Sequence, residues 1–350
     1  MDLISTYAQG VSELTGFSQS LEQAPLIVDV IVNPHAGFFK SHGTVLKLIQ
    51  ELEQKLTDLR RRFPRRKVEI NTVHLTERPG HARIITEGIL NAESRSTSGI
   101  ERLLVGCGGD GTSNEICTAL VHADGPLLDR LKLLRLPLGT GNDVADAHTF
   151  AEAYDLILGP QNTIKTGAIL VTSGSSQPRY SFNVGSIGLD AFIADLTNRF
   201  KRAIPGQAYK LMVDVGSLFY EQRIRPKPMD IRITGPAGET RIEAYVPSMV
   251  ILGISGARTY GGHMPVLPGR ENACVVGAMS VLSKIRNKKL FYLGRHGELS
   301  EVSFFQADQV DISYAGRIPM QLDGEISWLQ PSDFPLSMKV LEPRIKVLRV

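Results

Sequence analysis

The sequence predicts an α/β N-terminal domain with a parallel sheet, at residues 1–160, and a β-rich C-terminal domain, at residues 161–334. In the first half of the chain, strand-like and helix-like segments alternate. This alternation is typical of a parallel sheet with helices on both faces. After about residue 160 short strand-like segments dominate instead. A length of 350 residues also suits two domains better than one.

In the first domain the expected strands and helices follow one another closely. Apolar residues recur at steps of three and four between positions 43 and 59, which predicts an amphipathic helix. Residues 1–24 are weakly patterned and fit either a short helix or a disordered arm. Other helices are expected at 81–90 and 113–122, and strands at 26–32, 68–76, 103–105 and 131–136.

The second domain is expected to be built from short strands with a few helices between them. The sequence at 234–239 is typical of a hairpin turn. Helices are expected at 191–201, 209–220 and 284–293. Strands are expected at 164–172, 180–184, 229–234, 241–246, 249–253, 273–280, 302–305 and 310–313.

Two glycine-rich loops each follow an apolar strand. The first contains Gly108, Gly109, Asp110, Gly111 and Thr112, and the second contains Gly139, Thr140, Gly141, Asn142 and Asp143. Glycines let the backbone approach a polyanion and adopt positive φ, and a following helix directs its N–H groups at a phosphate. Either loop alone is also typical of an ordinary turn, but the pair within about forty residues favours one nucleotide site. Asp110 suits a metal ion that the phosphates also hold.

These motifs together resemble the diacylglycerol kinase catalytic-domain family, which includes sphingosine and ceramide kinases and soluble bacterial lipid kinases. The resemblance rests on the sequences GGDGTSNE at 108–115 and LPLGTGND at 136–143. It continues in family order at Asn33–Gly37, 76–82, 183–190, 261–262 and 323–325. A GGDGT sequence alone also occurs in NAD kinases, whereas the second loop and the distant Asp-Gly-Glu favour the lipid-kinase branch.

The resemblance implies a two-domain lipid kinase fold, NAD kinase-like, in which the last strands return to the first domain. The segments at 336–341 and 345–350 suit that return, so residues from about 335 to 350 are expected to complete the first domain. It also implies transfer of the γ-phosphate of ATP, with Mg²⁺, to a hydroxyl of diacylglycerol or a related lipid. NAD kinase is one alternative, and a non-catalytic, nucleotide-binding lipid-surface module is another.

Phosphoryl transfer requires a phosphate cradle, a metal ion and a group that accepts the proton of the attacking hydroxyl. The resemblance assigns Glu325 as general base, with Asp323 beside it near the metal, and Asp110 as a further catalytic and metal-linked acid. Taken alone, Asp323-Gly324-Glu325 is more typical of an exposed turn than of a catalytic site. The expected nucleotide-binding residues are Asn33, Thr76, Gly108, Gly109, Asp110, Gly111, Thr112, Asn114, Glu115, Gly139, Thr140, Gly141 and Asn142.

The chain departs from the family pattern in two places. Many bacterial members carry an acid after the second loop where this chain has Ile164-Lys165-Thr166-Gly167. They also have an Asp-Gly turn near a structural magnesium site, roughly where this chain reads Pro268-Gly-Arg-Glu-Asn272. These departures leave an auxiliary metal site and the identity of the lipid open.

Composition limits the cellular setting. No apolar run reaches the eighteen residues that would indicate a membrane span, and the N-terminus lacks the pattern of a secretory signal. The three cysteines are scattered, which favours neither disulfides nor a zinc site. A net charge of +3 gives no argument for nucleic acid. We therefore expect a cytoplasmic, peripherally membrane-associated protein; the sequence is also compatible with a homodimer.

Basic residues cluster at 60–67, where Arg60, Arg61, Arg62, Arg65, Arg66 and Lys67 occupy six of eight positions. Such a run is usually a solvated loop. The other interpretation is a docking patch for an anionic membrane, because each cation near such a surface contributes about 1 kcal/mol. Arg199, Lys201 and Arg202 form a second, smaller candidate.

Overall fold

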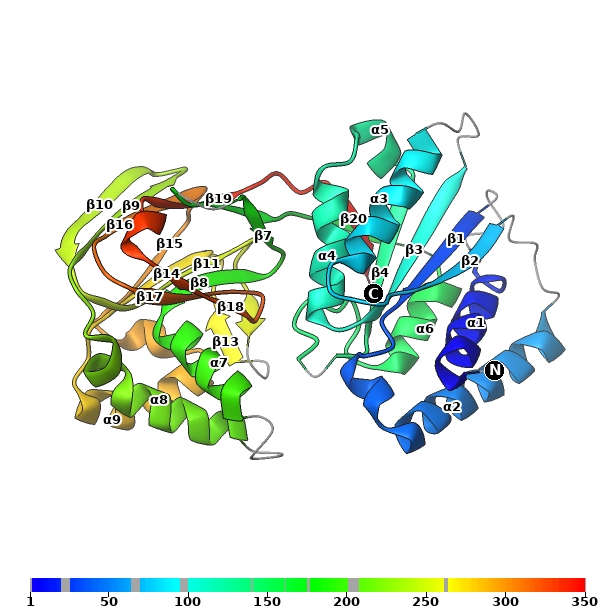
Figure 1. The fold of residues 1–350 in the computed structure, drawn as a ribbon, viewed down its shortest axis with the longest axis horizontal. Helices are drawn as coiled ribbons and strands as arrows, with labels where there is room; N and C mark the ends of the chain where they lie inside the picture. The colour runs from blue at the N-terminus through cyan, green and yellow to red at the C-terminus, as the bar shows by residue number, and fades with distance from the viewer. Residues whose placement is uncertain are drawn as a thin grey trace. The chain divides into compact units, whose positions relative to one another are not determined.

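The structure is a computed structural model that describes residues 2–19, 26–63, 70–94, 100–139, 141–160, 162–174, 177–200, 208–260 and 264–349. The chain divides into two compact units (Figure 1). The first contains residues 1–166 and 343–350, and the second contains residues 167–342. The sequence placed these boundaries at 160/161 and 334/335.

The first unit is an α/β domain around a six-stranded sheet. Its strands lie in the order β2 (Ile70–Leu75), β1 (Leu26–Val32), β3 (Glu101–Gly108), β4 (Leu131–Pro137), β20 (Ile345–Leu348), β5 (Thr163–Thr166). Neighbouring strands are parallel from β2 to β20, and only β5, at the edge, is antiparallel to its neighbour β20. Every residue of β1 is buried, as expected for a strand covered on both faces.

Helices cover both faces of this sheet (Figure 1). One group contains α1 (Leu3–Thr15), α2 (His42–Arg62) and α6 (Phe150–Leu158), and the other contains α3 (His81–Ser94), α4 (Asp110–Val121) and α5 (Gly125–Leu128). A short 3₁₀ helix, η2 (Gly37–Lys40), precedes α2. Of the two possibilities for the N-terminal segment, the structure has the helix. Its Tyr7, Val11 and Leu14 are fully buried in the core of the unit.

The second unit is a sandwich of two six-stranded sheets, with three α-helices among its described residues. One sheet has the order β10 (Gly238–Tyr245), β9 (Met229–Gly235), β16 (Gln309–Tyr314), β19 (Leu336–Val340), β6 (Ile169–Thr172), β7 (Arg179–Ser181). The other has the order β15 (Val302–Phe305), β14 (Ala273–Gly277), β11 (Pro247–Gly253), β8 (Val184–Gly188), β17 (Ile318–Leu322), β18 (Glu325–Leu329). Side chains from both sheets form one apolar core, with Ile231 and Val310 from the first and Val250 and Met320 from the second.

The outer face of the second sheet carries the helices α7 (Leu189–Phe200), α8 (Ala208–Ile224) and α9 (Val281–Tyr292) (Figure 1). Smaller elements complete the unit: the pair β12 (Arg258–Tyr260) and β13 (Met264–Leu267), and the 3₁₀ helices η3 (His296–Glu298) and η4 (Pro331–Asp333). The predicted combination of an α/β domain with a β-rich domain is therefore present.

One expectation about the C-terminus is wrong. Of the two strands expected to return to the first domain, only β20 does so, where it pairs with β4 and β5. Strand β19 instead pairs with β16 and β6 in the second unit. The physical reason is burial, because Leu336 and Met338 alternate along β19 and are fully buried in the sandwich core.

Candidate functional site

In the first unit the expected nucleotide-binding residues that the structure describes gather at the carboxyl edge of the parallel sheet. Four chain segments leave the sheet there, after β1, β2, β3 and β4, and backbone hydrogen bonds join them. The Asn33 N–H donates to Cys107 O (2.9 Å), and the Thr76 N–H donates to Val32 O (2.8 Å). This edge is where open α/β sheets bind ligands.

The two glycine loops touch each other through their backbones. A Cβ atom on Gly139 would lie 2.6 Å from Gly109 Cα, and a Cβ atom on Gly109 would lie 3.1 Å from Gly139 Cα. Real Cβ atoms do not approach a backbone as closely as the first of these distances. Glycine is therefore required at position 139 by the contact between the loops, in addition to any requirement from a bound phosphate.

Asp110 holds the second loop against the first. Helix α4 begins at Asp110, three residues earlier than the sequence indicated, so this carboxylate lies in the first turn of the helix. Its Oδ2 accepts the Asn142 N–H (3.0 Å), and its Oδ1 accepts the Val144 N–H (3.3 Å). One side chain from the first loop thus fixes the backbone of the second.

Asn142 shapes its own turn. It adopts a positive φ of 59°, a conformation that Asn tolerates better than most residues. Its side-chain Oδ1 accepts the Gly139 N–H (2.7 Å), and its Nδ2 donates to Pro137 O (3.2 Å). The expected nucleotide ligand Asn142 is therefore engaged in folding the loop. Thr140, from the same expected set, lies outside the described residues, as do Gly261 and Gly262.

The remaining predicted residues link neighbouring segments to α4. The Asn33 Nδ2 donates to Thr112 Oγ1 (2.9 Å), and a Cβ atom on Gly108 would collide with the Thr112 side chain. The Glu115 carboxylate accepts the backbone N–H groups of Gly80 (2.7 Å) and Ala82 (3.0 Å).

These contacts connect the segments after β1 and β2 to the first glycine loop. Gly111 lies in the first turn of α4. Asn114 lies one turn further on, where its Oδ1 accepts the Thr118 hydroxyl (3.3 Å).

No sequence motif predicted the ion pair between Arg135 and Asp146. Asp146 Oδ1 lies 2.6 Å from Arg135 Nη2, and Asp146 Oδ2 accepts both the Arg135 Nε–H (3.1 Å) and its backbone N–H (2.7 Å). Both side chains are buried. Because Arg135 lies on β4 and Asp146 follows the second loop, the pair closes that loop at its far end. The only sequence signal was an acid three positions after Asp143.

The residues at this edge fit a nucleotide with a magnesium ion. A Cβ atom on Gly141 would lie 2.8 Å from Asp110 Oδ2 and 3.6 Å from Asp143 Oδ2, so both carboxylates face the same stretch of backbone. A carboxylate has about four acceptor sites, so one carboxylate can accept N–H donors and also bind a metal ion. Oxygen ligands of this kind suit Mg²⁺. Among the described residues no group of three or more His, Cys, Asp and Glu side chains forms a metal cage.

In the second unit, Asp323 and Glu325 lie together on the turn between β17 and β18. Asp323 has a φ of 50° and Gly324 a φ of 91°, which makes the turn tight. The Asp323 carboxylate is buried, and it accepts the Ser181 hydroxyl and the N–H groups of Phe182, Asn183 and Val184 at 2.6–3.1 Å. Burial raises the pKa of Asp323, and these hydrogen bonds oppose the rise.

Glu325 is exposed at the first position of β18. The guanidinium of Arg179, which donates to Ser327 Oγ (2.9 Å), lies near enough to sense its charge. Burial lowers the pKa of Arg179, while the charges of Asp333 and Glu325 oppose that change. Asp323 is thus built into the turn that carries Glu325, whereas Glu325 itself faces solvent.

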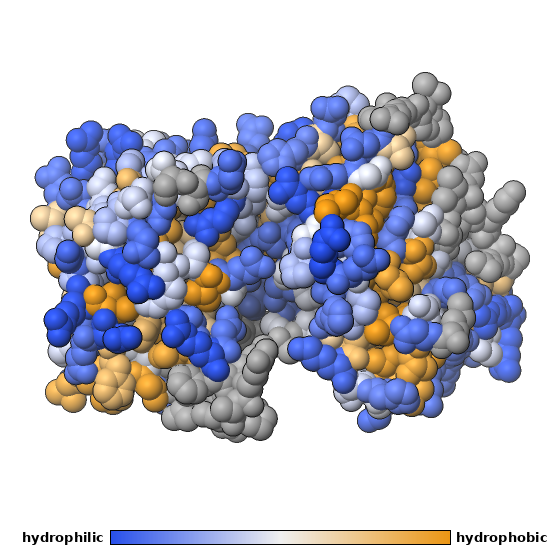
Figure 2. Space-filling model, in the orientation of Figure 1, coloured by the Kyte–Doolittle hydropathy of each residue, from blue (hydrophilic) through white to orange (hydrophobic). Residues whose placement is uncertain are grey.

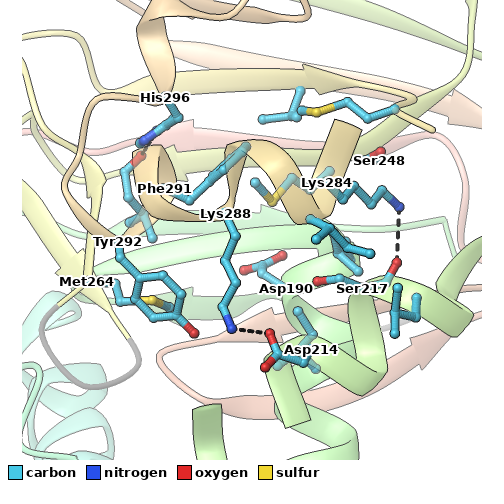
Figure 3. Close-up of a pocket in the computed structure, with 18 of the residues that line it drawn as sticks. Asp190, Asp214, Ser217, Ser248, Met264, Lys284, Lys288, Phe291, Tyr292 and His296 are labelled. Atoms are coloured by element: carbon cyan, nitrogen blue, oxygen red, sulfur yellow. Dashed lines mark hydrogen bonds and ion pairs between the residues drawn. The ribbon is translucent and has the colours of Figure 1, made fainter. Parts of the chain in front are cut away.

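A mostly apolar pocket of about 380 Å³ lies between the second sheet and the helices α7, α8 and α9 (Figure 3). Ile193, Met249, Ile251 and Phe291 are among its apolar lining residues. Its polar lining is sparse and includes Asp190, Asp214, Ser217, Ser248, Lys284, Lys288 and His296. An apolar pocket with a few polar groups is typical of small-molecule sites. No local sequence pattern predicted this pocket.

Asp190 is a buried acid in this pocket, and its pKa is raised. Its Oδ2 accepts the Ser186 hydroxyl, and Gln321 Nε2 donates to Ser186 Oγ (2.9 Å). Its Oδ1 is buried and has no hydrogen-bond partner among the described residues. Burial raises the pKa of Asp190 to about 6, against the opposing effect of these hydrogen bonds. Asp190 ends the motif at 183–190, which the sequence predicts only through its resemblance to the family.

The fold and the two glycine loops define the class of this protein. It is a two-domain protein that combines an α/β domain carrying glycine-rich loops with a β-sandwich domain. Residues 28–169 match the family model of the diacylglycerol kinase catalytic domain. The resemblance predicted from the motifs is therefore confirmed over these residues.

Curated relatives extend the likeness beyond this segment. YtlR of Bacillus subtilis (strain 168), named as a candidate lipid kinase, is 27% identical over 334 residues, which cover 90% of this chain and 98% of YtlR. A protein of the same organism named diacylglycerol kinase is 23% identical over 308 residues, covering 87% and 91% of the two chains.

A solved structure from Bacillus anthracis str. Sterne, named as a candidate diacylglycerol kinase, has the same fold. It superposes with a TM-score of 0.57 at 20% identity, covering 93% of this chain and 97% of its own. The predicted fold class is thereby confirmed. In the described part of the chain, no helix combines the length and the apolar character that a membrane crossing requires.

Proposed function

We propose that the protein is a lipid kinase that uses ATP and Mg²⁺ to phosphorylate a hydroxyl of diacylglycerol or a related lipid. The observation that carries this proposal is the contact between the two glycine loops, locked by Asp110 at the carboxyl edge of the sheet. The names of the relatives YtlR and diacylglycerol kinase support the same class of reaction.

In this proposal the first unit binds the nucleotide. The backbone of Gly108, Gly109, Gly139 and Gly141 holds the phosphates beside the N-terminus of α4, where the helix dipole favours negative charge. Asp110 and Asp143 would hold the magnesium ion. When bound, Mg²⁺ neutralises charge on the phosphate oxygens of ATP.

Glu325 acts as the general base that accepts the proton of the lipid hydroxyl. Its exposure leaves the carboxylate accessible to a substrate. Asp323 was expected near the metal, but its oxygens already accept four hydrogen bonds from Ser181 and the 182–184 backbone. We therefore assign Asp323 as a positioning residue that fixes the turn carrying Glu325.

The pocket under α9 supports a lipid as the acceptor. Its apolar lining and volume of about 380 Å³ suit part of an acyl chain better than a second nucleotide. Asp190 offers a buried hydrogen-bond acceptor to a polar group of that lipid.

The decisive experiment measures phosphate transfer from labelled ATP to lipids in mixed micelles, with and without Mg²⁺. Diacylglycerol, monoacylglycerol, ceramide and sphingosine make up the panel. Labelled product in at least one lipid arm, dependent on Mg²⁺, supports the proposal. Conversion of NAD to NADP identifies an NAD kinase instead. Binding of ATP without turnover on any lipid identifies a non-catalytic module.

A further inference from the structure

Helix α9 is unusual because none of its residues is buried. It covers the apolar pocket, yet several of its large apolar side chains face solvent. Leu282 is 75% exposed and Ile285 is 59% exposed, and Leu293, directly after the helix, is 53% exposed. A helix that packs only against its own domain buries its apolar stripe, so α9 has a second apolar face without a partner in the described structure.

The two faces of α9 have different neighbours. Lys284, Lys288, Phe291 and Tyr292 point toward the pocket, as Figure 3 shows. On the other side, positions three, four, seven and eleven after Leu282 share its face. We call this stripe the α9 outer face. All its members are exposed: Leu282, Ile285, Arg286, Lys289 and Leu293.

Charge on this helix has only one sign. Residues 281–292 contain four cations and no Asp or Glu. Lys284 pairs with Glu221 of α8, and Lys288 pairs with Asp214 of α8. Arg286 and Lys289, on the α9 outer face, form no ion pair with any residue that the structure describes.

Apolar side chains gather at the end of the second unit where α8 and α9 lie in Figure 1, as Figure 2 shows. The exposed Phe219 of α8 adds to the apolar side chains of this end of the unit. Exposed apolar residues beside cations are the composition of surfaces that lie in a membrane interface.

We propose that the α9 outer face docks the protein on an anionic bilayer. Leu282, Ile285 and Leu293 enter the boundary between headgroups and acyl chains, and Arg286 and Lys289 contact lipid phosphates. Ile285 also lines the pocket, so docking brings the pocket to the membrane. That consequence rests on the proposed lipid kinase function, whereas the docking itself does not.

The basic cluster at 60–67 is the alternative candidate for the membrane-docking surface. Arg60 is held by Glu13, with Nη2–Oε2 and Nε–Oε1 distances of 2.7 Å and 2.9 Å, and serves the packing of α1 on α2. Arg61 and Arg62 are exposed beside Phe63, and residues 64–67 lie outside the described residues. Among the second set, Arg199 pairs with Asp195 and Lys201 and Arg202 are not described.

Vesicle co-sedimentation without ATP tests the docking surface. Phosphatidylcholine vesicles are used with and without phosphatidylglycerol. The apolar variant is Leu282→Ser with Leu293→Ser, and the charge variant is Arg286→Ser with Lys289→Ser. The matched controls are Arg61→Ser with Arg62→Ser, and Ile84→Ser, which removes an apolar side chain that is 51% exposed in the first unit.

We expect the wild type to bind anionic vesicles more tightly, and less tightly as salt rises. Loss of two cations is expected to weaken that binding about tenfold or more. The apolar variant is expected to lose binding to both vesicle types, and both controls are expected to bind like the wild type. Loss of binding in the Arg61/Arg62 variant, with the α9 variants unaffected, overturns the proposal in favour of the 60–67 cluster.

The experiments also test whether the α9 outer face binds a second copy of the chain instead of a membrane. Size-exclusion chromatography could show that the wild type is a dimer and the Leu282/Leu293 variant a monomer, with vesicle binding unchanged. In that case α9 is a dimer interface and the proposal is overturned.

Failure of docking is separable from failure of the kinase function. A docking variant is expected to retain phosphorylation of a short-chain lipid dispersed as monomers, because the substituted residues do not line the pocket.

Discussion

The carboxylate of Asp110 accepts the backbone N–H of Asn142 across the two glycine loops, with an Oδ2–N distance of 3.0 Å. A second bond, from Val144 N–H to Oδ1 (3.3 Å), involves the other oxygen. A residue that the sequence indicated as a catalytic, nucleotide-binding and metal-linked acid therefore also determines where the second loop lies. Substitution of Asp110 affects both functions together.

Asp110→Asn is expected to lower ATP affinity and turnover together. The amide keeps one acceptor oxygen but directs an N–H₂ group at the other backbone N–H, so one of the two bonds is lost. The negative charge beside the phosphates is lost as well. Isothermal titration with ATP and Mg²⁺, alongside turnover measurements, checks this. Unchanged ATP affinity in the variant contradicts the assigned role.

Gly139→Ala is expected to separate the two loops. The new Cβ would lie 2.6 Å from Gly109 Cα and 2.9 Å from Asn142 Oδ1, and the backbone must shift to relieve these contacts. We expect a loss of ATP binding of at least about tenfold, because phosphate binding depends on loop position. Gly88→Ala is the matched control. Its Cβ meets nothing within 4 Å inside α3, so it is expected to bind ATP normally and to gain up to about 1 kcal/mol of stability.

Asp146→Ala is expected to destabilise the first unit by about 3–5 kcal/mol, because it leaves the Arg135 guanidinium buried without its partner. Urea unfolding at neutral pH measures the change. Asp155→Ala is the control. It removes an exposed pair with Lys55, which contributes about 0–1 kcal/mol. Equal losses in both variants would show that the Arg135–Asp146 pair contributes no more than a surface pair.

Asp190 is expected to make stability depend on pH. Burial raises the pKa of Asp190 from 3.8 to about 6. The folded state therefore binds this proton more tightly than the unfolded state, and the free energy of unfolding falls as pH rises from about 4 to about 6. The difference corresponds to roughly 3 kcal/mol. Urea unfolding of wild type and Asp190→Asn across pH 4–7 checks this, since the variant lacks the decline. Parallel curves for the two proteins would rule out the assignment.

Particular residues show how much of the fold and of the candidate site could be predicted from the sequence. Strand–helix alternation predicted the parallel sheet, and each glycine loop was expected directly after a strand. The same pattern could not assign β19 to a sheet, because a short alternating strand suits either domain. Only the fit of Leu336 and Met338 to the sandwich core decides it.

Long-range contacts explain the rest. Asp110 finds its partners more than thirty positions along the chain, and the pocket combines residues from Leu189 to His296. Neither leaves a local periodic signal. The basic cluster at 60–67 is a continuous stretch of the sequence and could be recognised there. The α9 outer face could be recognised only once the structure showed which side of the helix is covered.

Glu325→Gln is expected to lower turnover by about 10²–10⁴, the usual contribution of general acid–base catalysis, without weakening ATP binding. Glu325 is exposed at the start of β18, so its substitution leaves packing intact. Asp323→Asn is the informative contrast. It weakens the hydrogen bonds that fix the turn, so turnover and thermal stability are expected to fall together.

Glu342→Gln, at another exposed position of the second unit, is the control for charge loss. Turnover, ATP affinity and melting temperature are measured for all three variants. A base that acts only in the chemical step lowers kcat at constant ATP affinity. If Glu325→Gln retains most of its kcat, the proton acceptor is another residue, and Asp110 is the first to test.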